Sequence, residues 1–496
     1  MTVPTLIVAT ISLVIGFVTK DFEIEYVYAH SSQAMEPIYT WVAFYAGNEG
    51  SLLFIALMLS VMSAIAMLCS PRSIDNIRPY VISVLMSIQL FFLAVIILLA
   101  NPFTKMLFIP EDGQGINPLL IHFGMFIHPP MQMTGLISVA IPFSVAIGAM
   151  LSGRVGWDEW VDLGRLWAMV SWVLLTIGLI LGGWWAYTIL GWGGYWAWDP
   201  VENSALMPWL AMTAFVHSIM VQKHRGMFRM WNMVLIIVAF SFAEMGMFIN
   251  RGGPVPSVHS FAQSSMGWVF LAFMGFTLLG SLAVFVFRLG TLGSREKLDS
   301  LLSRESVFLL QNVLFLAVAF VTLWGTIYPV ISDVFQGVIV TVAEPFFNKV
   351  NGPILLGIVF LMGVGPLLPW RRATPSRVIS VLKFPLLGFL IVVMILLAIG
   401  INDLLPLLAL GICSMSVTGI VHEWIRGIVA RHKKGEIYPV AFARLFLGNR
   451  PRYGGYLVHL SIVMMSVGVI GSSFYDLQRD FVFLLALADA YEQVSV

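Results

Sequence analysis

The chain has 496 residues, of which 59% are hydrophobic and only 11% are charged, and its mean hydropathy is +0.90. Such a composition cannot cover a water-soluble globule with polar side chains, so a soluble protein is excluded. The formal net charge of +1 gives no reason to expect a nucleic-acid partner. Lipid must be the main solvent of this chain.

Thirteen apolar runs follow one another along the chain, each near the roughly twenty residues that cross a bilayer about 30 Å thick. They cover residues 3–19, 50–69, 79–100, 121–150, 164–190, 205–222, 231–249, 266–287, 306–328, 352–370, 379–400, 404–425 and 453–474. Backbone groups in hydrocarbon need partners within their own segment, and the runs are too long and too uniformly apolar for barrel strands. The sequence therefore predicts an all-α, polytopic membrane helix bundle with about thirteen transmembrane helices.

Lysine and arginine gather in alternate loops, which hold 22 of the 27 basic residues. By the positive-inside rule these loops face the cytoplasm, so the N-terminus is expected to be cytoplasmic and the C-terminus external. The first run lacks a basic leader and a small-residue cleavage site, which predicts a retained helix. We expect residues 1–496 to form one membrane domain, because no segment between the runs is long enough for another.

Tryptophan is concentrated in residues 184–209, a segment expected on the external side. The six residues are Trp184, Trp185, Trp192, Trp196, Trp198 and Trp209. Any one of them fits an aromatic belt at the level of the lipid headgroups. The cluster, in which Gly193 and Gly194 allow close backbone approach, indicates a flat apolar platform for a large planar ligand such as a porphyrin. Asp199 and Glu202 also fit a helix start, where they would be merely caps.

Four of the nine histidines are the stronger candidates for metal ligands. His128, in the segment FIHPP, and His259, in PSVHSF, are expected on the same external side as the tryptophan segment. For each of them alone, a structural or interfacial role is the alternative. The weaker candidates are His30, His122, His224, His422 and His432.

His217 and His459 lie within predicted spans, six and seven residues from basic residues of the cytoplasmic loops. At a rise of 1.5 Å per residue, each is roughly 10 Å from the inner edge of the membrane. Two intramembrane imidazoles at equal depth could hold one haem b between facing helices. A hydrogen bond to a neighbouring helix is the alternative for each.

Other polar residues receive lesser roles. Glu244, within a predicted span, could relay protons, although a hydrogen bond to a neighbouring helix is favoured. Arg251 could meet a haem propionate or anchor the chain at the interface. Cys69 and Cys413 are far apart and form no CxxC or CxxCH motif, which excludes a c-type cytochrome and a dithiol oxidoreductase.

The segment WGGYWAWDPVEN resembles the WWD signature of haem-handling membrane proteins. The number of spans favours the CcmF and NrfE type of cytochrome c haem lyase subunit over the shorter CcmC. Further segments similar to that family are DFEIEYVYAHSS, GNEGSLLFIAL, NPFTKMLFIPEDGQGINPLL, FIHPPM, SVHSFA and RYGGYLVHL. The resemblance runs from about Asp21 to Ile470.

The chain departs from the family pattern in three places. Asn48 stands where histidine is common, and the pattern usually has a further helix before residue 3 and a larger external region with a final helix after His459. These departures leave open whether another chain supplies the rest of the lyase.

The resemblance implies roles for the candidate residues. His128 and His259 would ligate the iron of haem held as substrate at the external platform, and His217 and His459 would be the ligands of an internal haem b. The platform would consist of Trp192, Gly193, Gly194, Trp196, Trp198 and Asp199, with Arg251 beside it. No catalytic residue is assigned, because adding a thiol to a vinyl group needs positioning more than a strong base.

The activity implied by the resemblance is covalent attachment of haem to the CxxCH thiols of apocytochrome c, within a complex in the inner (cytoplasmic) membrane and on its external, periplasmic face. The implied partners are a CcmE-type haem chaperone, a CcmH-type thiol reductase with its assembly subunits, and the apocytochrome. Two alternatives remain: a haem transporter or carrier without ligation activity, and a membrane cytochrome b that acts on a quinol. An ordinary secondary transporter is less favoured, because it would not need the tryptophan cluster.

Overall fold

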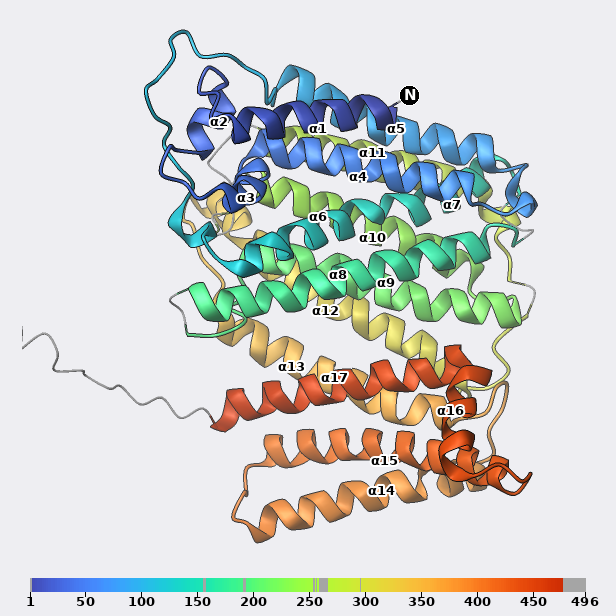
Figure 1. The fold of residues 1–496 in the computed structure, drawn as a ribbon. Helices are drawn as coiled ribbons and strands as arrows, with labels where there is room; N and C mark the ends of the chain where they lie inside the picture. The colour runs from blue at the N-terminus through green and yellow to red at the C-terminus, as the bar shows by residue number, and fades with distance from the viewer. Residues whose placement is uncertain are drawn as a thin grey trace, which may run out of the picture. The chain divides into compact units, whose positions relative to one another are not determined.

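The computed structural model describes residues 2–154, 158–190, 193–252, 255, 257, 266–294 and 296–475. Its helices are α1 (Thr2–Val18), α2 (Glu25–His30), α3 (Thr40–Phe44), α4 (Asn48–Leu68), α5 (Arg78–Leu98), α6 (His128–Ser138), α7 (Ala140–Leu151), α8 (Val161–Ile189), α9 (Pro200–Arg225), α10 (Arg229–Asn250), α11 (Met266–Arg288), α12 (Arg304–Gln336), α13 (Glu344–Val364), α14 (Pro375–Ala398), α15 (Leu404–His432), α16 (Tyr438–Gly448) and α17 (Arg450–Tyr475). Among these residues the extended pairing is limited to an isolated bridge between Ile24 and Lys105. The predicted all-α class is confirmed (Figure 1).

Each of the thirteen predicted apolar runs falls on helix. Twelve helical segments in the described part of the chain are long and apolar enough to cross a membrane, and the first run forms α1, which is shorter at 17 residues. The run at residues 121–150 is divided into α6 and α7 at Val139. Pro142 accounts for this break, because it has no N–H to donate to the carbonyl of Ser138.

The chain divides into two compact units. The first comprises Met1–Leu301 and Glu305–Leu355, and the second comprises Leu302–Arg304 and Leu356–Val496. A single membrane domain over the whole chain stays a prediction.

In the first unit, α7, α9 and α10 form the centre and α11 lies at the periphery. The spans that contain α7, α9 and α10 are mostly buried, whereas only a small part of α11 is buried. Phe143 of α7 stacks on Phe240 of α10, with the ring centroids 4.1 Å apart. The exposed side chains of α11 are apolar, as Phe276 and Leu279 illustrate. Such a surface suits a lipid surround and not water.

The loops of the first unit gather at two opposite ends (Figure 1). At the basic end, Nε of Arg288 donates to the carbonyl of Met150 at 2.8 Å. At the other end, here called the outer end, the hydroxyl of Tyr45 donates to the carbonyl of Met125 at 2.5 Å. Loops predicted to share a side therefore contact one another, and which end faces the cytoplasm stays a prediction.

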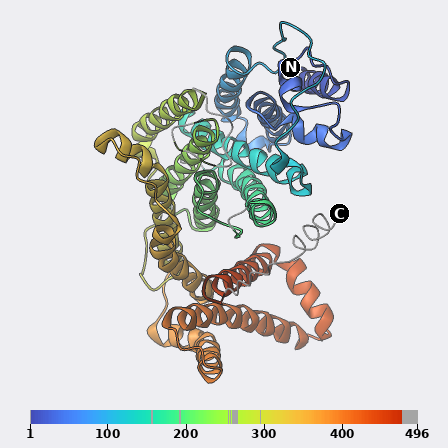
Figure 2. The same ribbon diagram turned by 90° about the vertical axis from the view of Figure 1, so that its left-hand side faces the viewer.

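The outer end carries two segments that fold together, residues 20–47 and 99–127. The backbone N–H of Met106 donates to the carbonyl of Glu23 at 2.7 Å, and that of Gln114 donates to the carbonyl of Tyr28 at 2.8 Å. Figure 2 shows the molecule from the side on which these segments lie. They are thus held by backbone bonds at the end where the tryptophan segment emerges.

In the second unit, α14 and α15 pack closely because small residues lie between them. A Cβ added at Gly388 of α14 would come within 2.1 Å of the hydroxyl oxygen of Thr418 on α15. Farther along the chain, α16 and α17 pack on α15 through a buried cluster. Its members are Ile420, Leu445, Tyr453 and Tyr456.

Candidate functional site

The tryptophan loop, residues 193–199, ends in a capping box at the start of α9. Asp199 is the N-cap, and its Oδ2 accepts from the backbone N–H of Val201 at 2.9 Å. Oε2 of Glu202 accepts from the backbone N–H groups of Ala197 and Asp199 at 3.0 and 3.1 Å. These bonds satisfy N–H groups at the helix start and hold the loop against it. The predicted capping role of both acids is therefore confirmed.

Trp198 joins the tryptophan loop to α13. Its φ of +55° lies in the left-handed region, which costs a residue other than glycine about 1 to 2 kcal/mol. Its carbonyl accepts from Nδ2 of Asn203 and its indole N–H donates to Oδ1 of Asn348, both at 2.8 Å. The indole also stacks on Phe347, with the ring centroids 4.9 Å apart. These contacts hold the strained backbone and fix the ring.

The rest of the described loop offers a ring edge and an open stretch of backbone. Trp196 stands edge-on to Trp198, with centroids 5.9 Å apart and an interplanar angle of 86°. Gly193 has a φ of +74°, which glycine adopts without strain, and no atom lies within 4 Å of the position a Cβ would take there. A planar ligand could approach the backbone at this point. Trp192, the remaining ring of the predicted platform, lies outside the described residues.

Ser257 fastens the segment after α10 to the tryptophan loop. Its hydroxyl donates to Oδ2 of Asp199 at 2.5 Å. This bond places Ser257 at the N-cap of α9, and His259 follows two residues later in the sequence. His259 itself lies outside the described residues, and its contact with haem stays a prediction.

His128 is the first residue of α6, so this helix begins seven residues after the start of the predicted run at residue 121, and the ring of His128 is oriented by α8. Nδ1 makes a hydrogen bond of 2.8 Å with the carbonyl oxygen of Gly178. A carbonyl can only accept, so Nδ1 carries the hydrogen, and in the neutral ring the lone pair is on Nε2. Histidines that bind a metal are commonly held in this way, with the other ring nitrogen donating to a carbonyl or a carboxylate.

His122, at the same end, has the opposite arrangement. Its Nδ1 accepts from the backbone N–H of Gly124 at 3.1 Å, so in the neutral ring the hydrogen is on Nε2. Its ring lies near Trp184, with centroids 5.2 Å apart. His122 was a weaker candidate in the sequence, and its tautomer supplies a physical reason for that ranking.

Arg251 links the end of α10 to the start of α4. Its side chain donates to Oγ of Ser51 at 2.5 Å and to Oδ1 of Asn48 at 3.1 Å. Arg251 is 1% exposed, and burial lowers its pKa to about 10, so the guanidinium still carries its charge near neutral pH. Asn48 is the position at which the family pattern commonly has histidine. A contact of Arg251 with a haem propionate stays a prediction.

His217 and His459 belong to different units. His217 lies in α9, eight residues from Arg225 at its basic end, and His459 lies in α17, nine residues from Arg450. Each is therefore about 12 to 14 Å along its own helix from a basic terminus. Nδ1 of His217 makes a hydrogen bond of 2.7 Å with the carbonyl of Thr213, which again leaves the lone pair of the neutral ring on Nε2. Their pairing across a haem stays a prediction.

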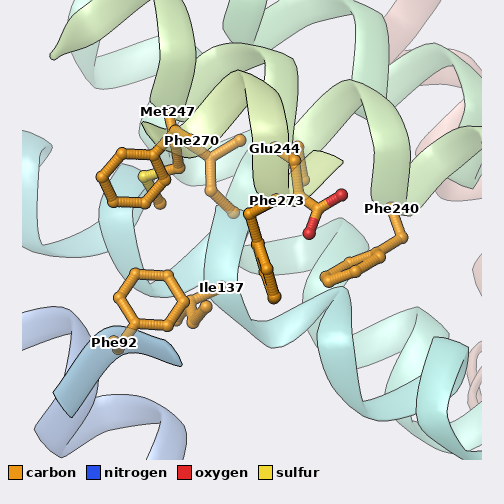
Figure 3. Close-up of a pocket in the computed structure, with 9 residues that line it drawn as sticks. Phe92, Ile137, Phe240, Glu244, Met247, Phe270 and Phe273 are labelled. Carbon is orange, nitrogen blue, oxygen red and sulfur yellow. The ribbon is translucent and has the colours of Figure 1, made fainter. Parts of the chain in front are cut away.

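Glu244 of α10 makes the hydrogen bond to a neighbouring helix that the sequence analysis favoured. Its Oε2 accepts from Oγ1 of Thr277 on α11 at 2.6 Å, and the side chain is buried. The carboxyl group lies between Phe240 and Phe273, which with Phe92 line a pocket of about 10 Å³ (Figure 3). A cavity of that size admits about one water molecule. It has no room for an organic ligand in this conformation.

We expect the substitution Glu244→Leu to leave the thermal unfolding midpoint unchanged or raised. Thr277 keeps a hydrogen-bond acceptor in the variant, because its hydroxyl also lies 3.1 Å from the carbonyl of Met274. Oε1 of Glu244 is buried without a hydrogen-bond partner among the described residues, and an apolar side chain of similar size removes that desolvation cost of about 1 to 3 kcal/mol. Thermal unfolding of the detergent-purified protein, followed by tryptophan fluorescence, measures the change. A clear fall in the midpoint would mean that Glu244 holds the helices together.

The chain is similar to known proteins along most of its length. A sequence model described as Cytochrome C assembly protein matches residues 45–253. The cytochrome c-type biogenesis protein CcmF of Pseudomonas aeruginosa is 36% identical over 94% of this chain and 70% of its own length, and that of Escherichia coli is 34% identical over 95% and 71%. A solved structure, "Cytochrome c Heme Lyase CcmF", has a TM-score of 0.76 at 30% identity and covers 95% of this chain and 69% of its own. The chain belongs to the CcmF family.

Membership of the CcmF family confirms the resemblance read from the sequence and makes cytochrome c biogenesis the functional class. The solved CcmF relative is named a haem lyase, which supports haem lyase activity for the family. The imidazole side chains of the site also suit haem as ligands of its iron. In the described part of the chain no three His, Cys, Asp or Glu side chains cluster around a possible metal ion, but haem iron needs only one or two axial imidazoles. In the neutral rings of His128 and His217, the hydrogen is on Nδ1 and the lone pair is on Nε2.

Proposed function

We propose that this CcmF-family protein binds haem at the outer end, between the tryptophan loop and α6, and takes part in attaching it to apocytochrome c. The observation that carries the proposal is the hydrogen bond from Ser257 to Asp199, because Ser257 lies at the tryptophan loop and stands two residues before His259 in the sequence. The fixed orientation of His128 supports the same site. The platform comprises Trp192, Gly193, Gly194, Trp196, Trp198 and Asp199, and Arg251 is the proposed partner of a propionate.

The attachment reaction needs positioning more than acid or base catalysis. His128 and His259 hold the iron of the substrate haem, and the histidine of the apocytochrome CxxCH motif replaces one of them. Each cysteine sulfur then forms a bond to one vinyl carbon, while the thiol hydrogen goes to the other carbon and the double bond becomes single. No oxidant is consumed, and two thioether bonds result. The protein contributes by holding the vinyl groups where the thiols arrive.

We also assign His217 and His459 as the ligands of an internal haem b. The assignment rests on the similar number of residues between each histidine and the basic end of its own helix, and on the resemblance to the family. When bound, this haem supplies an electron that keeps the iron of the substrate ferrous. The protein contributes by orienting the ring of His217 through Thr213 and by excluding water from a site within the membrane.

The setting proposed for this reaction is the inner membrane, with the outer end of the first unit on the periplasmic side. That placement follows from the distribution of basic residues between the two sides. A CcmE-type chaperone would deliver haem there, and a CcmH-type thiol reductase with its assembly subunits would present reduced apocytochrome. The protein would act as one subunit of that complex.

A reconstituted assay distinguishes the lyase from its two alternatives. The purified protein, with its assembly subunits, is supplied with reduced apocytochrome and haem-loaded chaperone, and the product is denatured and extracted to remove free haem. Haem that remains bound to the apocytochrome supports the lyase. Haem bound by the protein without a covalent product would indicate a carrier, and rapid quinol oxidation without one would indicate a cytochrome b.

Alanine variants at the two intramembrane histidines test the internal haem. We expect the wild-type protein to contain non-covalent haem b, and His217→Ala and His459→Ala each to lose most of it, because one imidazole holds haem far more weakly than two. The pyridine haemochrome of detergent-purified protein measures haem per polypeptide. His224→Ala, on the same helix as His217, is the control and should keep its haem. A wild-type protein without haem after mild extraction, or variants that retain it, would contradict the assignment.

A further inference from the structure

The second unit contains an apolar cavity at the corner between α15 and α16. Its volume is about 400 Å³, within the range of small-molecule sites. The lining residues are Ile425, Ile428 and Val429 of α15, and Tyr438, Pro439 and Phe442 of α16. Aliphatic and aromatic side chains therefore make up its walls, so its occupant must be apolar over the buried part.

The helix that closes this cavity is an interfacial one. With 11 residues, α16 is too short to span a bilayer, and it lies between the membrane-length helices α15 and α17. Ala441 and Leu445 are buried on its inner side, whereas Phe442 and Leu447 are 43% and 64% exposed. A helix with exposed apolar side chains beside two spans belongs in the boundary between headgroups and acyl chains.

The rim of the cavity carries positive charge that acidic residues do not balance. Residues 423–452 include seven basic side chains and two acidic ones. Glu423 pairs with Arg426 and Arg452, at 3.0 and 2.5 Å. Glu436 pairs with Arg431 and Arg444, at 3.0 and 3.2 Å. Each of the two carboxylates is thus already engaged by two arginines.

Three basic side chains remain, Lys433, Lys434 and Arg450, and the two lysines lie in the turn between α15 and α16. Both are exposed, and no described carboxylate lies within ion-pair distance of either. The preceding His432 stacks on the cavity-lining Tyr438, with ring centroids 4.0 Å apart, and its Nδ1 makes a hydrogen bond of 2.8 Å with the carbonyl of Glu436. The turn that bears the two lysines is therefore held at the mouth of the cavity.

We propose that the corner between α15 and α16 binds an anionic phospholipid, with an acyl chain in the cavity and the phosphate group at Lys433 and Lys434. The cavity supplies the apolar site and the lysines supply the charge, so both parts of such a lipid are recognised. A neutral phospholipid could fill the cavity, but its headgroup would leave the two cations uncompensated. This site is independent of haem binding and of the proposed lyase activity.

Lipid binding to the full-length protein in nanodiscs tests the proposal. Phosphatidylglycerol and phosphatidylcholine, each spin-labelled on the acyl chain, are titrated into discs, and the motionally restricted fraction is measured. We expect phosphatidylglycerol to be preferred about tenfold or more, since a basic residue near an anionic headgroup contributes about 1 kcal/mol. The double variant Lys433→Gln/Lys434→Gln should lose most of that preference.

Two further variants separate this site from general charge attraction. Arg371→Gln/Arg372→Gln removes two positive charges from residues of the same unit that do not line the cavity, and it should keep the preference. Val429→Phe narrows the cavity and should weaken binding of both lipids. Equal binding of the two lipids by the wild type, an equal loss of preference in the arginine variant, or unchanged binding by Val429→Phe would each overturn the proposal. Unfolding midpoints of all variants verify that the protein remains folded.

Discussion

Cells that carry the His128→Ala variant are expected to make at least about tenfold less holocytochrome c than cells with the wild-type protein, because the substrate haem loses an iron ligand. The hydrogen bond from Nδ1 to Gly178 fixes the direction of the ring, and alanine removes both the imidazole and this bond. The experiment uses a strain that lacks its own CcmF relative. Haem staining of denatured c-type cytochrome gives the yield, and immunoblotting gives the level of the variant.

His122→Ala is the matched control for this experiment. His122 lies at the same end, and its ring contacts Trp184, but its Nδ1 accepts a hydrogen bond from Gly124, so its neutral Nε2 carries a hydrogen. We expect this variant to keep at least about half of the wild-type yield, since it loses only one turn-stabilising bond of about 1 kcal/mol. Rescue of His128→Gly by added imidazole would identify a lost ligand. Equal losses in His122→Ala and His128→Ala would point to a structural role for both.

Much of the fold could be predicted from the sequence, because the lipid bilayer restricts which backbone structures can form. A bilayer requires long apolar helices with internally bonded backbones, and the thirteen runs met that requirement segment by segment. The local chemistry of helix starts was also readable. Asp199 caps α9, as its motif indicated, whereas α6 begins at His128 and not at residue 121, where the apolar run starts. These features depend on residues near one another in sequence.

Contacts between helices could not be predicted in the same way. The indole of Trp198 donates to Asn348 and stacks on Phe347, 150 and 149 positions along the chain. A soluble helix marks its buried face with apolar residues, whereas a membrane helix is apolar all round, so the pattern does not say which face meets a neighbour. The sequence does contain one signal of a close helix contact. Gly178 and Gly182, four residues apart on α8, mark a face that another group can approach closely.

The second large effect is expected from a substitution at Gly182. This residue has no side chain and is not a proposed ligand of haem. A Cβ added there would come within 2.6 Å of Cε1 of His128 and within 3.3 Å of Nε2. Since the ring is held by Gly178, it can yield only by breaking that hydrogen bond or by moving α6 from α8. Overpacking of this kind costs about 1 to 3 kcal/mol, and it turns the imidazole from its fixed direction. We expect Gly182→Val to lower holocytochrome yield at least about tenfold.

Gly275→Val on α11 is the control, because nothing lies within 4 Å of the position its Cβ would take. Both substitutions replace glycine by valine within a membrane-spanning helix, so they share any effect of propensity or insertion. Only Gly182→Val disturbs His128. If it lowers the yield while its membrane level matches that of Gly275→Val and its unfolding midpoint stays above the assay temperature, the loss lies in the orientation of His128. A Gly182→Val protein with full activity would mean that attachment tolerates a displaced His128, and the assignment of that residue as an iron ligand would have to be abandoned.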